Sequence, residues 1–232
     1  MESGFFPAPH CGRNRNRKAK EMSKKQVEQQ EARTEHREEK AIPRAWREDI
    51  NNALEVLRNG GVILYPTDTI WGIGCDATNA DAVRRVYEIK HRADSKALIT
   101  LVDNEAKISF YVRDVPNVAW DLIDYASRPL TIIYDGGRNL AENLMAEDGS
   151  VAIRVTREPF SRELCFRFRK ALVSTSANVS GDPSPASFSE ISEDIVSAVD
   201  YVVEARRNEK PQSCPSSIIK LGAKGEVKII RK

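Results

Sequence analysis

From about residue 43 onward, apolar residues alternate between helical spacing and short continuous runs. The first run at helical spacing is followed by the pair Gly60-Gly61, a common stop signal for a helix. Residues 62–65 then have the continuous apolar character of a short buried strand. Asp81 is a suitable N-cap for a second helix that would end at Lys90. The apolar positions of the first helix are Trp46, Ile50, Ala53, Leu54 and Leu57.

Helices and strands are predicted to interleave over the rest of the chain. The further strands are expected at 97–102, 130–134, 151–155, 172–175, 201–203, 217–221 and 227–230. The further helices are expected at 117–125, 159–171 and 190–198. This alternation indicates an α/β fold, with a sheet and helices packed on it.

Residues 1–43 have a different composition and are predicted to form a charged, disordered extension of a domain that spans 44–232. Basic residues without acids fill 13–20, and charged and polar residues fill 23–40 almost completely. Such a segment buries too little apolar surface to offset its ordering entropy. Three interpretations stay open: a basic arm for RNA, a solvated tail without a role, or an artefact of an upstream start with Met22 as the true first residue.

Composition excludes several classes of protein. The net charge of +2 neither requires nor excludes a nucleic-acid partner. Four scattered cysteines without a C-x-x-C pair argue against a disulfide framework or a zinc site, so each is expected to be a small buried or neutral residue in a reducing compartment. No apolar run is long enough to span a membrane, and no signal-peptide pattern is present. A cytoplasmic location is expected.

Three separated stretches carry candidate chemistry. The first, residues 65–72, reads Y-P-T-D-T-I-W-G and places two threonine hydroxyls after a buried strand, where open α/β sheets commonly bind ligands. Gly72 and Gly74 allow close approach of the backbone to a ligand. The alternative is a capped turn, in which Thr67 and Asp68 bond to their own backbone.

The second stretch supplies fixed positive charge at Lys90 and Arg92, and further cations follow at Lys96, Arg128, Arg138 and Arg154. Arg154 lies inside the apolar run 151–155, where a charge needs a partner. That partner is either an anionic ligand or a nearby acidic residue in a salt bridge.

The third stretch, residues 174–181, reads S-T-S-A-N-V-S-G after an apolar strand, an arrangement suited to cradling phosphate. It differs from the Walker A and dinucleotide-binding fingerprints.

These stretches, in this order, resemble the YrdC-like family of L-threonylcarbamoyladenylate synthases from about residue 47 to the end. The resemblance rests on the Y-P-T-[DE]-T-x-[YW]-G block, on Lys90-x-Arg92 and on Ser176-x-Asn178. It implies a twisted, open mixed sheet with flanking helices and a large, positively lined cleft. It also implies condensation of L-threonine, bicarbonate or carbon dioxide, and ATP into threonylcarbamoyl-AMP and pyrophosphate, for N6-threonylcarbamoyladenosine modification of tRNA.

The resemblance also implies roles for individual residues. Lys90 and Arg92 would be catalytic phosphate ligands. Threonine would contact Thr67, Arg154 and Ser216. The nucleotide would contact Lys90, Arg92, Ser150, Ser176, Asn178, Ser184 and Arg231. Mg²⁺ is expected with ATP, held by phosphate oxygens and water rather than by a dedicated ligand cluster.

Implied partners are the threonylcarbamoyl transferase machinery downstream and, as a possibility left open, tRNA or double-stranded RNA. The chain departs from the family pattern in three turns: Ala97 replaces a proline, Arg128 replaces a glycine before Pro129, and Thr156 replaces a proline. The alternative to a synthase is a related protein that binds nucleotide or double-stranded RNA without making the adenylate.

Overall fold

The computed structural model describes residues 42–91, 98–209, 215–222 and 225–232. The chain divides into two units, residues 1–41 and 42–232, and the description below concerns the second. The expectations for the N-terminal extension, Arg92, Lys96, Ala97, Cys11 and Cys214 fall outside the described residues.

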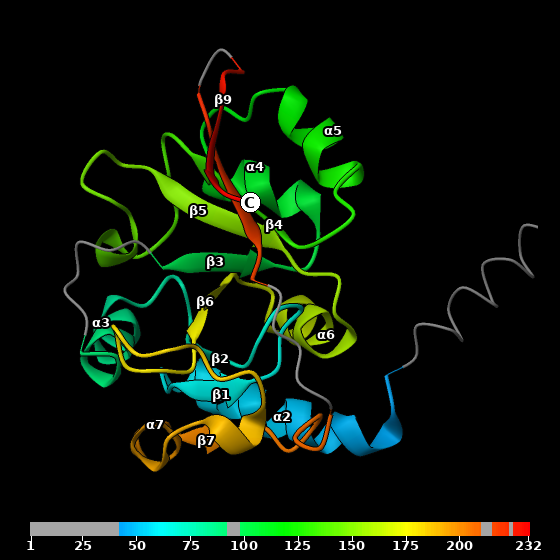
Figure 1. Cartoon of the computed structure of the whole chain (residues 1–232), viewed down its shortest axis with the longest axis vertical. Coiled ribbons are helices and arrows are strands. Elements are labelled where there is room, and N and C mark those ends of the chain that lie inside the picture. Colours follow the sequence, from blue (N-terminus) through cyan, green and yellow to red (C-terminus); the bar gives the residue numbers. More distant parts are fainter. Residues whose placement is uncertain (1–41, 92–97, 210–214, 223–224) are drawn as a thin grey trace, which may run out of the picture. The chain divides into compact units, whose positions relative to one another are not determined.

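A single twisted, mixed sheet organises the described part of the chain (Figure 1). Its strands lie in the order β7-β1-β2-β6-β3-β5-β4-β8-β9. Three neighbouring pairs are parallel (β1 with β7, β3 with β5, β4 with β8), and the other pairs are antiparallel. The strands are β1 (Ile63–Tyr65), β2 (Gly72–Gly74), β3 (Ile99–Val102), β4 (Leu130–Tyr134), β5 (Val151–Val155), β6 (Leu172–Ser176), β7 (Tyr201–Val202), β8 (Ser217–Leu221) and β9 (Val227–Arg231). The mixed α/β fold inferred from the sequence is confirmed.

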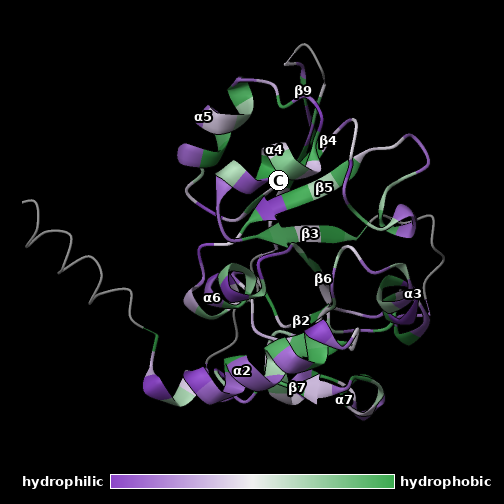
Figure 2. Ribbon diagram, turned by 180° about the vertical axis from the view of Figure 1, so that it is seen from behind, coloured by the Kyte–Doolittle hydropathy of each residue, from purple (hydrophilic) through white to green (hydrophobic). Residues whose placement is uncertain are grey.

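Helices join these strands and cover the sheet. The α-helices are α2 (Arg44–Arg58), α3 (Ala80–Ile89), α4 (Ile108–Tyr111), α5 (Val118–Asp124), α6 (Pro159–Phe168) and α7 (Glu193–Ala198). Single 3-10 turns occur at Glu105–Lys107, Glu142–Leu144 and Phe188–Glu190. Figure 2 shows the central strands β3 and β5 mostly in the green of apolar residues, because helices and strands bury both of their faces. Within the described residues, no helix is both long and apolar enough to cross a membrane.

The core contains both cysteines that the structure describes. Cys75 and Cys165 are buried and carry free thiols. Burial in apolar surroundings raises the pKa of each thiol well above its ordinary value, so neither is a ready nucleophile. The expectation that they are small buried residues is confirmed for these two.

Several predicted boundaries are wrong, for identifiable reasons. The N-cap of α3 is Asn79 and not Asp81, since the Asn79 side chain accepts hydrogen bonds from the N–H groups of Asp81 and Ala82. Helix α6 ends before residue 171 because Arg169 adopts a left-handed conformation with φ of 64°. Helix α7 begins at residue 193 rather than 190, after a separate 3-10 turn. Strand β2 and helix α4 were not predicted from the sequence.

Gly74 has a different role from the one expected. A Cβ at this position would lie about 2.5 Å from the ring of Tyr65 and 2.6 Å from the carbonyl oxygen of Val173. The missing side chain therefore allows close packing of β2 against its neighbours in the protein, rather than approach of a ligand. Gly72 is less constrained, with the nearest atom, the carbonyl oxygen of Thr175, at 3.2 Å from such a Cβ.

A buried carboxylate on α2 holds the segment that follows β7. Asp49 accepts hydrogen bonds from the Tyr201 hydroxyl at 2.6 Å and from the N–H groups of Glu204 and Ala205 at 2.9 and 2.7 Å. Asp49→Ala is expected to lower the free energy of unfolding by about 2–4 kcal/mol, because it leaves these donors without their acceptor. Urea unfolding would measure the loss. Glu55→Ala, which removes a carboxylate at an exposed position of the same helix, is the control, and a loss for Asp49→Ala as small as that of the control would contradict the prediction.

Candidate functional site

The loop between β1 and β2 is a compact turn built around one hydroxyl. Thr67 Oγ1 accepts a hydrogen bond from the N–H of Thr69 at 3.1 Å and donates to the carbonyl oxygen of Ile70 at 2.7 Å. The hydroxyls of Thr67 and Thr69 are 3.1 Å apart. The capped turn expected as an alternative is therefore present for Thr67. This turn holds the hydroxyls of Thr67 and Thr69 close together after the end of β1.

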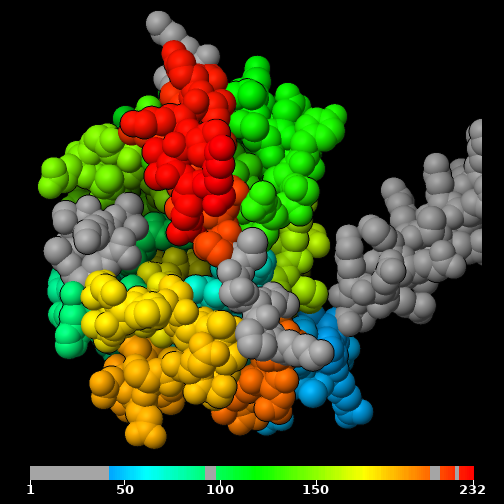
Figure 3. Space-filling view, viewed as in Figure 1, coloured from blue at the N-terminus to red at the C-terminus, as the bar shows by residue number. Residues whose placement is uncertain are grey.

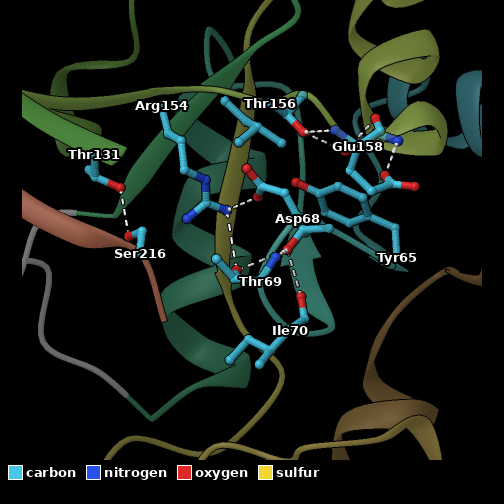
Figure 4. Close-up of polar contacts among 12 residues, drawn as sticks. Tyr65, Asp68, Thr69, Ile70, Thr131, Arg154, Thr156, Glu158 and Ser216 are labelled. Carbon is cyan, nitrogen blue, oxygen red and sulfur yellow. Dashed lines mark hydrogen bonds and ion pairs between the residues drawn. The ribbon is translucent and has the colours of Figure 1, made fainter. Parts of the chain in front are cut away.

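Asp68 has a different partner, which resolves part of the question left by the sequence. Its Oδ1 lies 3.1 Å from Nη2 of Arg154, and the same nitrogen is 3.5 Å from Thr69 Oγ1 (Figure 4). Arg154 is 3% exposed, and its Nε has no hydrogen-bond partner among the described residues. Burial raises the pKa of Asp68, while the neighbouring Arg154 acts in the opposite direction. Arg154 thus has an acidic partner and still has donor capacity left over.

A second guanidinium reaches the same region from β9. Arg231 donates from Nε to the carbonyl oxygen of Ser216 at 3.0 Å and from Nη2 to the Ser216 hydroxyl at 3.3 Å. That hydroxyl is also 2.9 Å from the hydroxyl of Thr131 on β4. Burial, together with the nearby positive charge of Arg154, lowers the pKa of Arg231. A buried guanidinium (Arg154) and an exposed one (Arg231) that repel one another create a place where an anion is favoured.

Lys90, at the end of α3, supports the loop after β6. Its Nζ donates to the carbonyl oxygens of Ser176 and Asn178, each at 2.6 Å. Lys90 is 1% exposed, so its charge is held inside the protein next to this loop. The side-chain amide of Asn178 donates to the carbonyl oxygens of Val179 and Asp182 and so folds the loop back on itself. Gly181, with φ of 104°, supplies the backbone conformation that this reversal needs.

These elements surround a cavity of about 240 Å³. Figure 3 shows the surface hollowed between β9, in red, and the segment after β6, in yellow. Among the residues that line the cavity are six of the predicted site residues, Thr67, Arg154, Ser176, Ser184, Ser216 and Arg231, together with Thr69 and Gly72 of the first polar stretch. They come from positions up to 164 residues apart in the chain (231 − 67 = 164), and the order of the strands brings them together.

The other predicted site residues lie elsewhere. Lys90 and Asn178 are connected to the cavity through the loop that contains Ser176. Ser150 precedes β5 and bonds through its N–H to Asp148, and it is not among the residues that line the cavity. Its nucleotide contact stays a prediction, as do that of Arg92 and the larger, positively lined cleft.

Further lining residues were not assigned to the site from sequence. They include Trp71, Leu98 and Pro215. Trp71 falls inside the Y-P-T-D-T-I-W-G block, so the block itself was a usable signal. Leu98 and Pro215 each adjoin a segment outside the described residues, and nothing in their local sequence marks them as part of a site.

No preformed metal centre is evident in the described residues, where no group of three or more His, Cys, Asp or Glu side chains comes together.

Comparison with known proteins gives relatives over most of the described unit. The Sua5/YciO/YrdC family model, described as telomere recombination, matches residues 55–232. A threonylcarbamoyl-AMP synthase of Pseudoalteromonas translucida is 36% identical over 155 residues, which cover 66% of this chain and 83% of the relative. A threonylcarbamoyl-AMP synthase of Pseudomonas aeruginosa is 41% identical over 133 residues, which cover 57% and 71%.

Solved structures share the fold. YciO of E. coli superposes with a TM-score of 0.66 at 25% identity, covering 79% of this chain and 88% of its own. Sua5 of P. abyssi, in complex with L-threonine, superposes with a TM-score of 0.67 at 23% identity, covering 74% of this chain. The chain spans about half the length of that Sua5 protein, since the match covers 50% of it. The family model, the curated relatives and the shared sheet lead to one conclusion: this chain belongs to the Sua5/YciO/YrdC family.

Proposed function

We propose that the chain is an L-threonylcarbamoyladenylate synthase. The observation that carries the proposal is the convergence of Arg154 and Arg231 on one cavity, beside the hydroxyls of Thr67, Ser176 and Ser216. Two cations and several hydroxyl donors suit a pair of anionic substrates, the carboxylate of threonine and the phosphates of ATP. The curated relatives named threonylcarbamoyl-AMP synthase support the same reaction.

Threonine is proposed to bind through its carboxylate to Arg154. Asp68 occupies one nitrogen of this guanidinium, while the Nε is available to a further acceptor. Thr67 and Ser216 lie at the same cavity and would contact the amino acid. The nucleotide is proposed to lie toward Ser176, Ser184 and Arg231, with Lys90 and Arg92 as its phosphate ligands.

The proposed reaction has two bond-forming steps. The threonine amine attacks carbon dioxide to form an N–C bond, and the amine loses a proton to give the carbamate. A carbamate oxygen then attacks the α-phosphorus of ATP, a new P–O bond forms, and the α–β phosphoanhydride bond breaks. Pyrophosphate leaves with that electron pair. Negative charge builds up on the phosphate oxygens, so the protein contributes mainly by positioning the substrates and stabilising charge.

Mg²⁺ would arrive with ATP and offset the charge of the triphosphate. The product is proposed to pass to a threonylcarbamoyl transferase that acts on tRNA. Direct binding of RNA by this chain remains a separate proposal and is not needed for formation of the adenylate.

Purified protein with ATP, Mg²⁺ and bicarbonate is expected to release pyrophosphate only when L-threonine is added. Mass spectrometry of the nucleotide product should identify threonylcarbamoyl-AMP in equal amount. L-Valine is the matched control because it replaces the threonine hydroxyl with a methyl group of similar size. ATP binding without a threonine-dependent product would reject the synthase and favour a nucleotide-binding or RNA-binding relative.

A further inference from the structure

A second cavity lies on the other face of the sheet from the proposed active site. Its volume is about 160 Å³, and it is lined by the α4–α5 region together with β4 and β5. Side chains alternate between the two faces of a strand. On β5, Ile153 and Val155 therefore line this second cavity, while Arg154 between them lines the first. On β4, Ile132 and Tyr134 line the second cavity as well.

The wall of the second cavity is mainly apolar, with two buried oxygen atoms that lack hydrogen-bond partners. The hydroxyl of Tyr134 has none among the described residues, although Tyr134 is only 1% exposed. Oδ1 of Asp68 accepts no hydrogen bond either, although it lies 3.1 Å from Arg154 as an ion pair. A buried hydroxyl without a hydrogen-bond partner is unfavourable, so a ligand that supplied a partner to Tyr134 would recover part of this cost.

The charges around the cavity favour a neutral ligand. The carboxylate of Asp68 is already compensated by Arg154. The guanidinium of Arg157 donates to the carbonyl oxygens of Ile123 and Ala126 at 2.7 and 3.2 Å, which closes one side of the cavity. Of the charged residues that line the cavity, Asp68 and Arg157 therefore both have partners in the protein. Arg128 at the rim is exposed.

The rim of the cavity is formed by Ser127, Arg128 and Pro129. None of these three residues lines the cavity of the proposed active site.

We propose that this second cavity binds a compact neutral amphiphile, a molecule with an apolar body of about one six-membered ring and a single hydroxyl group. Cavities of about 150 Å³ lined by aliphatic side chains bind benzene, which sets the size of the apolar body. The hydroxyl would pair with Tyr134 or with Oδ1 of Asp68. Because Asp68 also holds Arg154, a ligand here would contact the same ion pair that borders the active site.

Phenol and benzene are the probes, because they differ by the one hydroxyl group. NMR titration of the full chain is expected to show phenol binding about 5-fold tighter than benzene, the ratio that one net hydrogen bond of about 1 kcal/mol gives. Nuclear Overhauser contacts from phenol to the methyl groups of Ile123 and Ile153 should place it in the cavity. Absence of these contacts in the wild-type protein at saturating phenol would overturn the proposal.

Three variants refine the test. Tyr134→Phe should weaken phenol binding about 5-fold and leave benzene unchanged within about 2-fold, if the tyrosine hydroxyl is the partner. An unchanged preference for phenol would assign the pairing to Asp68 instead, and equal binding of both probes to the wild type would reject the hydroxyl requirement.

Ala126→Phe should fill the cavity and abolish binding of both phenol and benzene. Val56→Ala, at a partly buried apolar position on α2 away from the cavity wall, is the control that should bind both as the wild type does.

Discussion

Lys90→Ala is expected to reduce threonine-dependent pyrophosphate release by at least about 100-fold and to destabilise the fold at the same time. Lys90 is buried, and its Nζ donates to two carbonyl oxygens, those of Ser176 and Asn178. The substitution removes a charge proposed to face the phosphates, and it also leaves the loop after β6 without this support. The free energy of unfolding should fall by about 2–4 kcal/mol, because two partly buried carbonyl acceptors lose a charged donor.

The two effects of Lys90→Ala can be separated by temperature and by a control. Activity measured well below the unfolding midpoint reports the loss of function in the folded enzyme, and calorimetry reports the loss of stability. Lys220→Ala is the matched control, because Lys220 is a partly exposed lysine that pairs with Asp148 and Asp135 outside the cavity. A folded Lys90→Ala enzyme with undiminished turnover of ATP would reject the proposed phosphate site.

Arg154→Gln is expected to lower kcat/KM for threonine by about 100-fold or more, because a charged hydrogen bond to the threonine carboxylate is lost. The substitution should also lower the free energy of unfolding by about 3–5 kcal/mol, since Asp68 is left as an unpaired buried charge. Steady-state kinetics with varied threonine and urea unfolding measure the two losses. Arg162→Gln, an exposed arginine on α6, is the control for the substitution itself.

The double variant Asp68→Asn/Arg154→Gln distinguishes charge pairing from substrate binding. It removes both charges, so it should recover most of the stability that Arg154→Gln loses and none of its activity. A double variant as unstable as Arg154→Gln alone would show that the ion pair is not the source of the loss.

The stability of Arg154→Gln should depend on pH in a definite direction. Burial raises the pKa of Asp68 in the folded protein, and removal of Arg154 takes away the main influence that lowers it. A carboxyl group whose pKa is higher in the folded state binds more protons there, so folding becomes more favourable as the pH falls. The stability deficit of Arg154→Gln relative to the wild type should therefore shrink between pH 7 and pH 5.

Much of the sheet could be predicted because its strands are short apolar runs bounded by turn residues. The run 151–155, for example, was predicted as a strand and forms β5, and Arg154 stood out in it as a charge that needs a partner. The three polar stretches each follow or precede such an element, so their approximate positions at strand and helix ends could be predicted too.

The identity of that partner could not be predicted from sequence. Asp68 and Arg154 are 86 residues apart, and many acidic residues could have met Arg154 until the strand order was known (154 − 68 = 86). Strand β2 was missed for a local reason, since its three residues include two glycines, which strands normally avoid. The choice between Asn79 and Asp81 as the N-cap of α3 depends on where the preceding turn ends, because both residue types are good N-caps.

The position of Arg231 on β9 has a consequence for the order in which the protein acquires its activity during translation. Strand β8, which follows Ser216, pairs with β4 from 87 residues earlier (217 − 130 = 87), and Arg231 then joins it from β9. The ribosome makes these residues after every other part of the cavity wall. A nascent chain that contains only strands β1 through β6 still lacks the guanidinium of Arg231 and the hydroxyl of Ser216. The growing polypeptide therefore acquires Arg231 and the Ser216 hydroxyl late, and a product truncated before Ser216 would lack both groups at the cavity.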